Sequence, residues 1–335
     1  MDYSRDDIVS MLRSEGDERD ELFRRAVAVR DGAIGDGVYL RGLIEYSNIC
    51  RKNCLYCGIR KDSTSDRYVL SPEQVIEAAR YAWEHRYGSV VLQGGENTSP
   101  QHTALITQLL REITEVSGGE LGITLSLGEQ SPEVYREWRE AGATRYLLRV
   151  ETSDRELYRR IHPNDATHDF DRRVQALSDL REAGFMVGTG VMIGLPFQTI
   201  ESLADDLLFM QRLDIDMCGM GPYILSEGTP LVQFAGELQT EQWRFDLTLK
   251  MIAALRLLMP DINIAATTAL QAIDPHGRVK AIDAGANVIM PNLTPDDMRG
   301  NYLLYNNKPM SLDSKIMERN IRYGEKGDPQ HFDKR

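Results

Sequence analysis

The sequence predicts an α/β fold, a complete (βα)8 TIM barrel formed by a single domain. Eight apolar, strand-like runs alternate with amphipathic helical runs after residue 37, which is the pattern of parallel strands joined by crossover helices. Serine-proline pairs and glycines mark the starts and ends of several of these helices. The 335 residues are many for one ordinary domain but lie within the range of such barrels.

The elements follow one another in a regular order. Strands are expected at 38–47, 89–95, 121–128, 144–151, 186–196, 216–224, 262–270 and 286–292, and helices at 72–86, 103–116, 132–141, 171–183, 200–213, 240–258 and 277–284. Ser71 and Ser131 each precede a proline, so an N-cap hydroxyl is followed by a favourable first helical residue. We assign 1–36 to an N-terminal helical segment, 37–295 to the barrel and 296–335 to a C-terminal extension.

Composition and charge exclude several classes of protein. The net charge is −12 and the pI is near 5.1, whereas proteins that bind nucleic acid or a membrane surface need a basic footprint. No apolar run approaches the roughly 18 residues that span a bilayer. The N-terminus, "MDYSRDDIVSMLRSEGDERDELFRR", lacks the apolar segment of a signal peptide. We expect a soluble cytoplasmic protein, in which disulfides are rare.

The carboxyl ends of the predicted strands are polar or rich in glycine. In barrels of this class the active site is built at these ends and in the loops that follow them. The residues concerned are Glu45, Ser47, Gln93, Gly94, Gly95, Glu96, Thr124, Ser126, Arg149, Glu151, Gly194, Gly221, Thr267, Thr268 and Asn292. The sequence therefore predicts one large polar site at the top of the barrel.

Three of the four cysteines lie in "ICRKNCLYCGIR", in the loop after the first strand. Cys50, Cys54 and Cys57 have the spacing CxxxCxxC. A disulfide would leave one thiol unpaired, structural zinc usually has four ligands, and buried inert thiols are unexpected beside charged residues. An iron–sulfur cluster fits better because thiolates are its usual ligands, and three thiolates for four irons leave one iron open. We expect the fourth cysteine, Cys218, to be a buried and inert thiol within an apolar strand.

CxxxCxxC with Tyr56 before the last cysteine, after the first strand of a barrel, resembles the radical S-adenosylmethionine (SAM) enzymes. "LQGGE" at 92–96 is similar to their second signature. The resemblance implies one [4Fe-4S] cluster whose open iron binds the amine and carboxylate of SAM. An electron from the cluster then cleaves SAM to methionine and a 5′-deoxyadenosyl radical. It also implies cofactor contacts from Tyr56, Gly94, Gly95, Glu96, Thr124, Ser126, Glu151, Arg173, Gly194 and Gly221, with Arg173 paired to the SAM carboxylate.

Within that superfamily the sequence resembles the biotin synthase-like branch, and most closely the HydE family of [FeFe]-hydrogenase maturases. "TLSLGE", "RYLLRVETS", "GLPFQT" and "GANVIMPNLTP" carry this likeness across about 38–305. It implies that the radical attacks the cysteine sulfur of an iron species carrying cysteine, carbon monoxide and cyanide. The partners implied are an electron donor such as flavodoxin or ferredoxin, and the sister maturases HydG and HydF. The C-terminal region has no cysteine, so one cluster per chain is expected.

The substrate residues follow from the same reasoning. Arg149 and Glu151 are two positions apart, so their side chains share a face of the strand. Arg149 would hold an amino-acid carboxylate, with further predicted catalytic contacts from Gln93, Thr267, Thr268, Met290 and Tyr305. Val150 and Gly94 stand where the resembled family leads us to expect a histidine and a serine, and these two differences bear on substrate choice.

Two alternative functions remain open. One is a methylornithine synthase-like mutase acting on a free amino acid, and the other is a non-enzymatic scaffold stabilised by zinc. The basic residues Arg51, Lys52, Arg60 and Lys61 flank the cysteines and either dock an acidic electron donor or balance the charge of the cluster.

Overall fold

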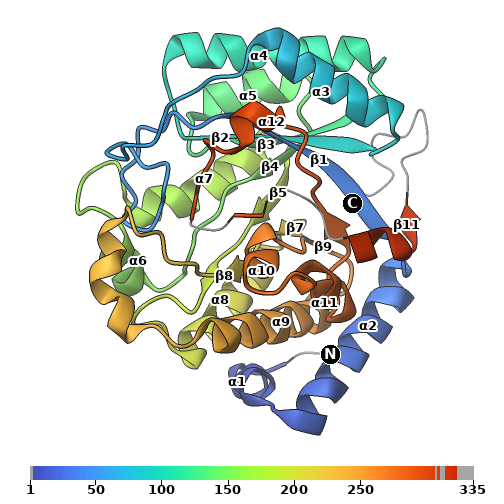
Figure 1. Cartoon of the computed structure of the whole chain (residues 1–335), viewed down its shortest axis with the longest axis vertical. Coiled ribbons are helices and arrows are strands. Elements are labelled where there is room, and N and C mark those ends of the chain that lie inside the picture. The colour runs from blue at the N-terminus through green and yellow to red at the C-terminus, as the bar shows by residue number, and fades with distance from the viewer. Residues whose placement is uncertain (1–2, 306–307, 310–313, 323–335) are drawn as a thin grey trace.

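The computed structural model describes residues 3–305, 308–309 and 314–322. Eight parallel strands form a barrel in the order β10-β1-β2-β3-β4-β5-β7-β9, and the bridge between Ala265 and Val288 joins its first and last members. Helices surround the strands (Figure 1). The predicted (βα)8 barrel is therefore confirmed.

Each predicted strand has a counterpart in the structure. The barrel strands are β1 (Val38–Ser47), β2 (Ser89–Gly94), β3 (Gly122–Ser126), β4 (Arg145–Leu147), β5 (Met186–Thr189), β7 (Met217–Cys218), β9 (Asn263–Ile264) and β10 (Val288–Ile289). A small edge strand, β11 (Ile321–Arg322), pairs with β1. The long strand β1 carries the cysteine loop at its carboxyl end, as expected from the sequence.

The predicted helices also form, with boundaries shifted by a few residues. They are α3 (Pro72–Glu84), α4 (Pro100–Val116), α5 (Pro132–Glu140), α7 (Phe170–Glu182), α8 (Ile200–Arg212), α9 (Glu241–Leu258) and α11 (Gly277–Asp283). Ser71 and Ser131 accept hydrogen bonds from Gln74 and Val134 as N-caps. Gly142, Gly184 and Gly285 follow helix ends with positive φ angles, a conformation that glycine adopts without strain.

The second half of the barrel is less regular than predicted. The fifth and sixth predicted strands are each interrupted, and their continuations, β6 (Met192–Ile193) and β8 (Gly221–Pro222), form a separate two-stranded sheet. At the interruption a Cβ on Gly190 would overlap the carbonyl of Gly219, so the two backbones are in direct contact. The predicted strand 262–270 ends early because Thr268–Ile273 forms helix α10. Helices α6 (Arg155–Ile161) and α12 (Asp296–Arg299) and the 3₁₀ helices η1 (Pro230–Glu237) and η2 (Ser314–Glu318) were not predicted.

The N-terminal segment forms α1 (Arg5–Arg13) and α2 (Gly16–Ile34), which pack against α8 and α9 (Figure 1). Arg5 pairs with Asp205 at 2.7 Å, and Lys250 pairs with Glu15 at 2.9 Å. These contacts lie far from the cysteine loop, and the predicted domain boundaries stay a prediction. Among the described residues, none of the helices combines the length and the apolar character needed to cross a bilayer.

Candidate active site

A cavity of about 310 Å³ lies at the carboxyl ends of the barrel strands and brings most of the predicted site residues together. Its walls come from β1, β2 and β3, from the segments after β4, β7 and β9, and from Tyr302, Leu304, Tyr305 and Lys308. The predicted residues that line it are Cys50, Tyr56, Cys57, Gln93, Gly94, Gly95, Glu96, Ser126, Arg149, Glu151, Arg173, Gly221, Thr267, Thr268, Met290 and Tyr305. Most of the polar strand ends therefore lie around one cavity, whereas Ser47, Thr124, Gly194 and Asn292 do not line it.

The three cysteines of the loop are half-buried, and Cys50 and Cys57, but not Cys54, line the cavity. Burial raises the pKa of the Cys54 thiol to about 12, and it also raises the pKa values of Cys50 and Cys57. The free thiols therefore hold protons, which ligand binding must displace. No group of three or more His, Cys, Asp or Glu side chains in the described parts of the chain converges on a single metal ion. A [4Fe-4S] cluster needs no such convergence because each thiolate binds a different iron, so the loop fits this group.

The loop is fixed by hydrogen bonds to its backbone. The guanidinium of Arg67 donates to the carbonyls of Asn48 and Ile59 at 2.7 and 2.9 Å, and to other carbonyls of the loop. The amide of Gly58 donates to the Leu304 carbonyl at 2.9 Å, where any larger residue would overlap the backbone. These contacts hold the cysteine spacing without using the thiols themselves.

The glycines of "LQGGE" let strand β2 lie directly against the cysteine loop. A Cβ on Gly94 would overlap the Tyr46 ring, and one on Gly95 would overlap the Ile49 carbonyl and the Cβ of Cys50. Close packing within the chain is therefore one reason for glycine here. The expected contact between this backbone and the SAM amine stays a prediction.

Behind the loop, four charged side chains form a buried ion cluster. Lys52 lies 3.2 Å from Glu96 and 3.4 Å from Glu129, and Arg173 lies 2.6 Å from Glu129 and 3.6 Å from Glu96. The four side chains are at most 11% exposed. Burial raises the pKa of Glu96, whereas Arg173 and Lys52 oppose that shift. Two cations and two carboxylates thus neutralise one another.

This ion cluster changes two expectations from the sequence. Lys52 is buried and paired, so it is not part of an exposed basic surface for an electron donor, unlike the exposed Arg51 and Lys61. Arg173 lines the cavity but is already paired with two carboxylates. A SAM carboxylate at this place would have to compete with Glu96 and Glu129.

Arg149 and Glu151 form an ion pair at 2.8 Å on the cavity wall. Arg149 also donates to the Val191 carbonyl at 3.0 Å. Glu151 has a φ of +67°, which is unusual for a residue other than glycine and is found at functional sites. Burial raises the pKa of the Glu151 carboxyl, although Arg149 and Arg173 oppose the shift. The two side chains therefore lie side by side, as their spacing predicts.

The remaining predicted substrate residues are held by short contacts. Thr267 donates to the Met220 carbonyl at 3.2 Å, and Thr268 accepts from Arg278 at 2.9 Å. Gln93 donates to the Tyr302 hydroxyl at 3.2 Å. Burial raises the pKa of the Tyr305 hydroxyl, so this group is a hydrogen-bond donor at neutral pH. Met290 adds an apolar wall to the cavity.

Some predicted residues lie elsewhere. Thr124 and Cys218 line a smaller space of about 40 Å³ deeper in the barrel. Cys218 is buried, as predicted, and contacts the Met210 sulfur at 3.7 Å. Gly194 is outside the cavity and is required by its φ of +80° and by its contact with Arg244. The hydroxyl of Tyr56 is directed toward His162, 3.5 Å away, at the cavity edge.

The structure also shows cavity residues that sequence reasoning missed or left without a role. Glu45 accepts hydrogen bonds from Lys308 and, at 2.9 Å, from Asn292. Tyr302 and Lys308 come from the C-terminal segment and complete the wall. Glu45 stands at the end of β1, which is a signal in the sequence. Lys308 and Tyr302 are remote from the strand ends in the chain, and no motif in the sequence marks them as site residues.

Comparisons with known proteins agree with this geometry. Residues 44–210 match the family model described as the radical SAM superfamily. The [FeFe] hydrogenase maturase subunit HydE of Thermotoga maritima is 46% identical over 289 residues, which are 86% of this chain and 79% of that protein. The 3-methylornithine synthase of Methanosarcina barkeri is 31% identical over 86% of this chain and 78% of its own length.

The crystal structure of methylornithine synthase (PylB) matches this fold with a TM-score of 0.83 and 26% identity, over 99% of this chain and 97% of that one. The cysteine loop, the glycine-rich end of β2 and the likeness to HydE along most of both chains lead to one conclusion: this chain belongs to the radical SAM superfamily and is an enzyme of the HydE type.

Proposed function

We propose that the enzyme acts in the assembly of the [FeFe]-hydrogenase active site, on a cysteine-bound iron carbonyl cyanide precursor. The observation that carries this proposal is the 46% identity to HydE over most of both chains. The cavity supports it, because Cys50 and Cys57 of the cysteine loop line it together with the Arg149–Glu151 pair. When bound, the [4Fe-4S] cluster and SAM supply a 5′-deoxyadenosyl radical.

The residues of this chain then have separate roles. Cys50, Cys54 and Cys57 would hold the cluster. SAM would bind beside it, against Tyr56, Gly94, Gly95, Glu96, Ser126, Glu151 and Gly221, which line the same cavity. Thr124 and Gly194 lie outside the cavity, and Arg173, which lines it, is already paired with two carboxylates. Their cofactor contacts stay predictions.

The substrate would occupy the part of the cavity farther from the thiols. Arg149 offers a guanidinium to the carboxylate of the substrate cysteine, and Glu151 keeps that guanidinium in place. Thr267, Thr268 and Tyr305 supply hydroxyl groups around it. SAM and the substrate, once bound, would displace water from this cavity, which protects a reactive species from side reactions.

The direct test is the maturation of an apo-hydrogenase in vitro with HydG and HydF as partners. We expect hydrogenase activity when this protein replaces HydE, and none when Cys54→Ala replaces it. A flavodoxin or ferredoxin would supply the electron, and we expect it to approach the exposed Arg51 and Lys61 beside the loop. No hydrogenase activity with the intact, cluster-loaded protein would contradict the proposal.

A second candidate is a methylornithine synthase-like mutase. The likeness to PylB over nearly all of both chains favours it, and Arg149 would bind a free amino acid equally well. This function predicts rearrangement of lysine in the presence of SAM and reductant, with no effect on hydrogenase maturation.

A further inference from the structure

Arg278 is a buried cation that has no carboxylate partner among the described residues. It lies on α11 and is 4% exposed. Its Nε is buried and has no hydrogen-bond partner in the described part of the chain. Burial lowers the pKa of Arg278 to about 10, so the guanidinium keeps its charge at neutral pH. A buried charge without a counter-ion is costly to the fold, which points to a role in the neighbouring site.

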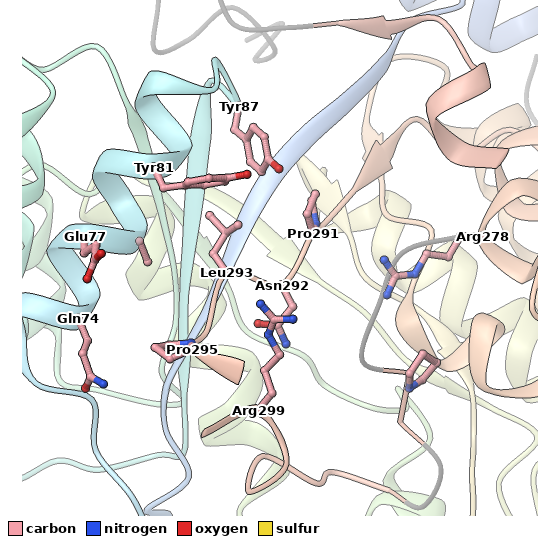
Figure 2. Close-up of a pocket in the computed structure, with 12 residues that line it drawn as sticks. Gln74, Glu77, Tyr81, Tyr87, Arg278, Pro291, Asn292, Leu293, Pro295 and Arg299 are labelled. Atoms are coloured by element: carbon pink, nitrogen blue, oxygen red, sulfur yellow. The ribbon is translucent and has the colours of Figure 1, made fainter. Parts of the chain in front are cut away.

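The fold brings Arg278 to the outer side of the active-site wall. Helices α10 and α11 pack against each other, and a Cβ on Gly277 would overlap the Leu270 carbonyl. This close approach places Arg278 beside Thr268, the first residue of α10. Figure 2 shows the Arg278 side chain extending from its helix toward the segment that carries Asn292, in the wall of a groove of about 600 Å³. Arg278 lines this groove and not the active-site cavity, so it reaches the active site through its contacts.

Arg278 sets the direction in which the Thr268 hydroxyl forms hydrogen bonds. The Nη2 of Arg278 donates to Thr268 Oγ1 at 2.9 Å. Because a guanidinium can only donate, Thr268 accepts here and keeps its own proton for another partner. Thr267 is in the opposite state, because its hydroxyl donates to the Met220 carbonyl at 3.2 Å. Both threonines line the active-site cavity, so together they offer a ligand one donor, Thr268, and one acceptor, Thr267.

The same end of the cavity carries an excess of positive charge. Burial raises the pKa of the Tyr305 hydroxyl, and the positive charges of Arg278 and Arg149 oppose that rise. Both guanidinium groups therefore lie near Tyr305, which lines the cavity. Arg149 and the nearby carboxylate of Glu45 each already have an ion-pair partner. The charge of Arg278 is left uncompensated among the described residues, and it favours an anionic group of a ligand.

We propose that Arg278 is a positioning residue that selects an amino-acid substrate through its carboxylate. It acts through Thr268, whose free proton donates to a carboxylate oxygen, and its own charge stabilises that anion. Thr267 accepts a hydrogen bond from the amine of the same group. The inference rests on the proposed function only for the identity of the substrate. The cysteine of the iron complex and the lysine of the second candidate function both carry an α-amino-acid group.

The test compares two ligands that differ in the carboxylate: the cysteine-bound iron carbonyl cyanide complex and the same complex carrying cysteamine. Each is titrated into cluster- and SAM-loaded protein without reductant, and infrared spectroscopy of the carbonyl bands gives Kd. Arg278→Met removes the charge and the hydrogen bond, whereas Arg278→Lys keeps a charged donor. Lys280→Met is the matched control, because Lys280 is an exposed cation of the same helix.

We expect Arg278→Met to weaken binding of the cysteine complex at least about tenfold, and binding of the cysteamine complex less than about twofold. Arg278→Lys should recover most of the preference for the carboxylate, and Lys280→Met should equal the wild type. Thr268→Val should lower the preference to a similar extent. Its combination with Arg278→Met should cost little more, because the two residues act on one carboxylate. The unfolding temperature of Arg278→Met should be no lower than that of the wild type, because an uncompensated buried charge is lost.

An unchanged preference in Arg278→Met would overturn the inference. An equal loss of both complexes with a lower unfolding temperature would also overturn it, because a purely structural role gives that result. If the wild-type protein binds neither complex, the proposed function has failed. The same comparison is then made by calorimetry with lysine and its decarboxylated analogue. A wild-type protein without a preference for the carboxylate in either pair would overturn the role of Arg278 itself.

Discussion

Lys52 provides a strong test of how the cysteine loop is held. It lies between Cys50 and Cys54 in the sequence, but its ammonium group is buried between Glu96 and Glu129, at 3.2 and 3.4 Å. Lys52→Met keeps the length of the side chain and removes the charge. Two buried carboxylates then share Arg173 alone.

The magnitude follows from the loss of charge balance. Removing one partner of a buried ion pair costs about 3–5 kcal/mol. An unfolding entropy of roughly 2.1 cal/mol/K per residue gives about 0.7 kcal/mol/K for 335 residues. The expected fall in Tm is therefore about 4–7 °C.

The assay is thermal unfolding of the metal-free and the cluster-loaded protein, together with the iron content per chain. Lys61→Met is the control, because Lys61 is an exposed lysine of the same loop. Lys52→Met combined with Glu129→Gln restores neutrality and should recover about half of the lost Tm. A single variant as stable as Lys61→Met, or a double variant no better than the single one, would refute the reasoning.

Three further predictions follow from the site and the core. Cys54→Ala should abolish both the brown colour of the reconstituted protein and reductive SAM cleavage, whereas Cys218→Ala should retain both. A brown Cys54→Ala protein would contradict the assignment of Cys54 as a cluster ligand. Arg149→Ala should leave uncoupled SAM cleavage largely intact and end substrate consumption; loss of SAM cleavage would assign Arg149 to the cofactor. Burial raises the pKa of Asp206 from 3.8 to about 7, so between these pH values the folded state holds a proton that the unfolded state releases. The free energy of unfolding therefore falls as pH rises through this interval, by roughly 4 kcal/mol at most. Asp206→Asn keeps an acceptor for Ser153 and should unfold at a higher temperature than the wild type at pH 8 but not at pH 4; equal differences at both pH values would contradict this.

The barrel and the cysteine loop could be predicted because local signals specify them. Ser71 and Ser131 cap helices that their own sequences favour, and the carboxyl ends of parallel strands must meet at one end of a barrel. The prediction was less accurate where the signal is not local. The approach of Gly190 to Gly219 depends on two strands that are distant in the chain. The helix at Thr268–Ile273 replaces a strand end because its residues suit either structure.

Most of the predicted site residues line one cavity, but the ion pairs among them could not be predicted. The sequence places Glu96 and Arg173 near the cofactor, but nothing in it shows that Glu129 and Lys52 neutralise them. Thr124 lies near a strand end but lines the smaller space deeper in the barrel, so its cofactor contact stays a prediction. Lys308 was missed because it reaches Glu45 from a segment that follows the barrel. Such contacts join residues that are distant in the chain, so a local sequence motif does not predict them.

The central claim is that this enzyme couples SAM cleavage to the consumption of the cysteine-bound iron complex. The most direct measurement mixes the cluster-loaded protein, SAM, a reductant and the complex without oxygen, and quantifies 5′-deoxyadenosine and the remaining complex over time. We predict that the complex disappears as 5′-deoxyadenosine forms, in a constant ratio, and that Arg149→Ala breaks this coupling. A colourless protein that binds one zinc and forms no 5′-deoxyadenosine would contradict the account, and so would SAM cleavage that leaves the complex unchanged.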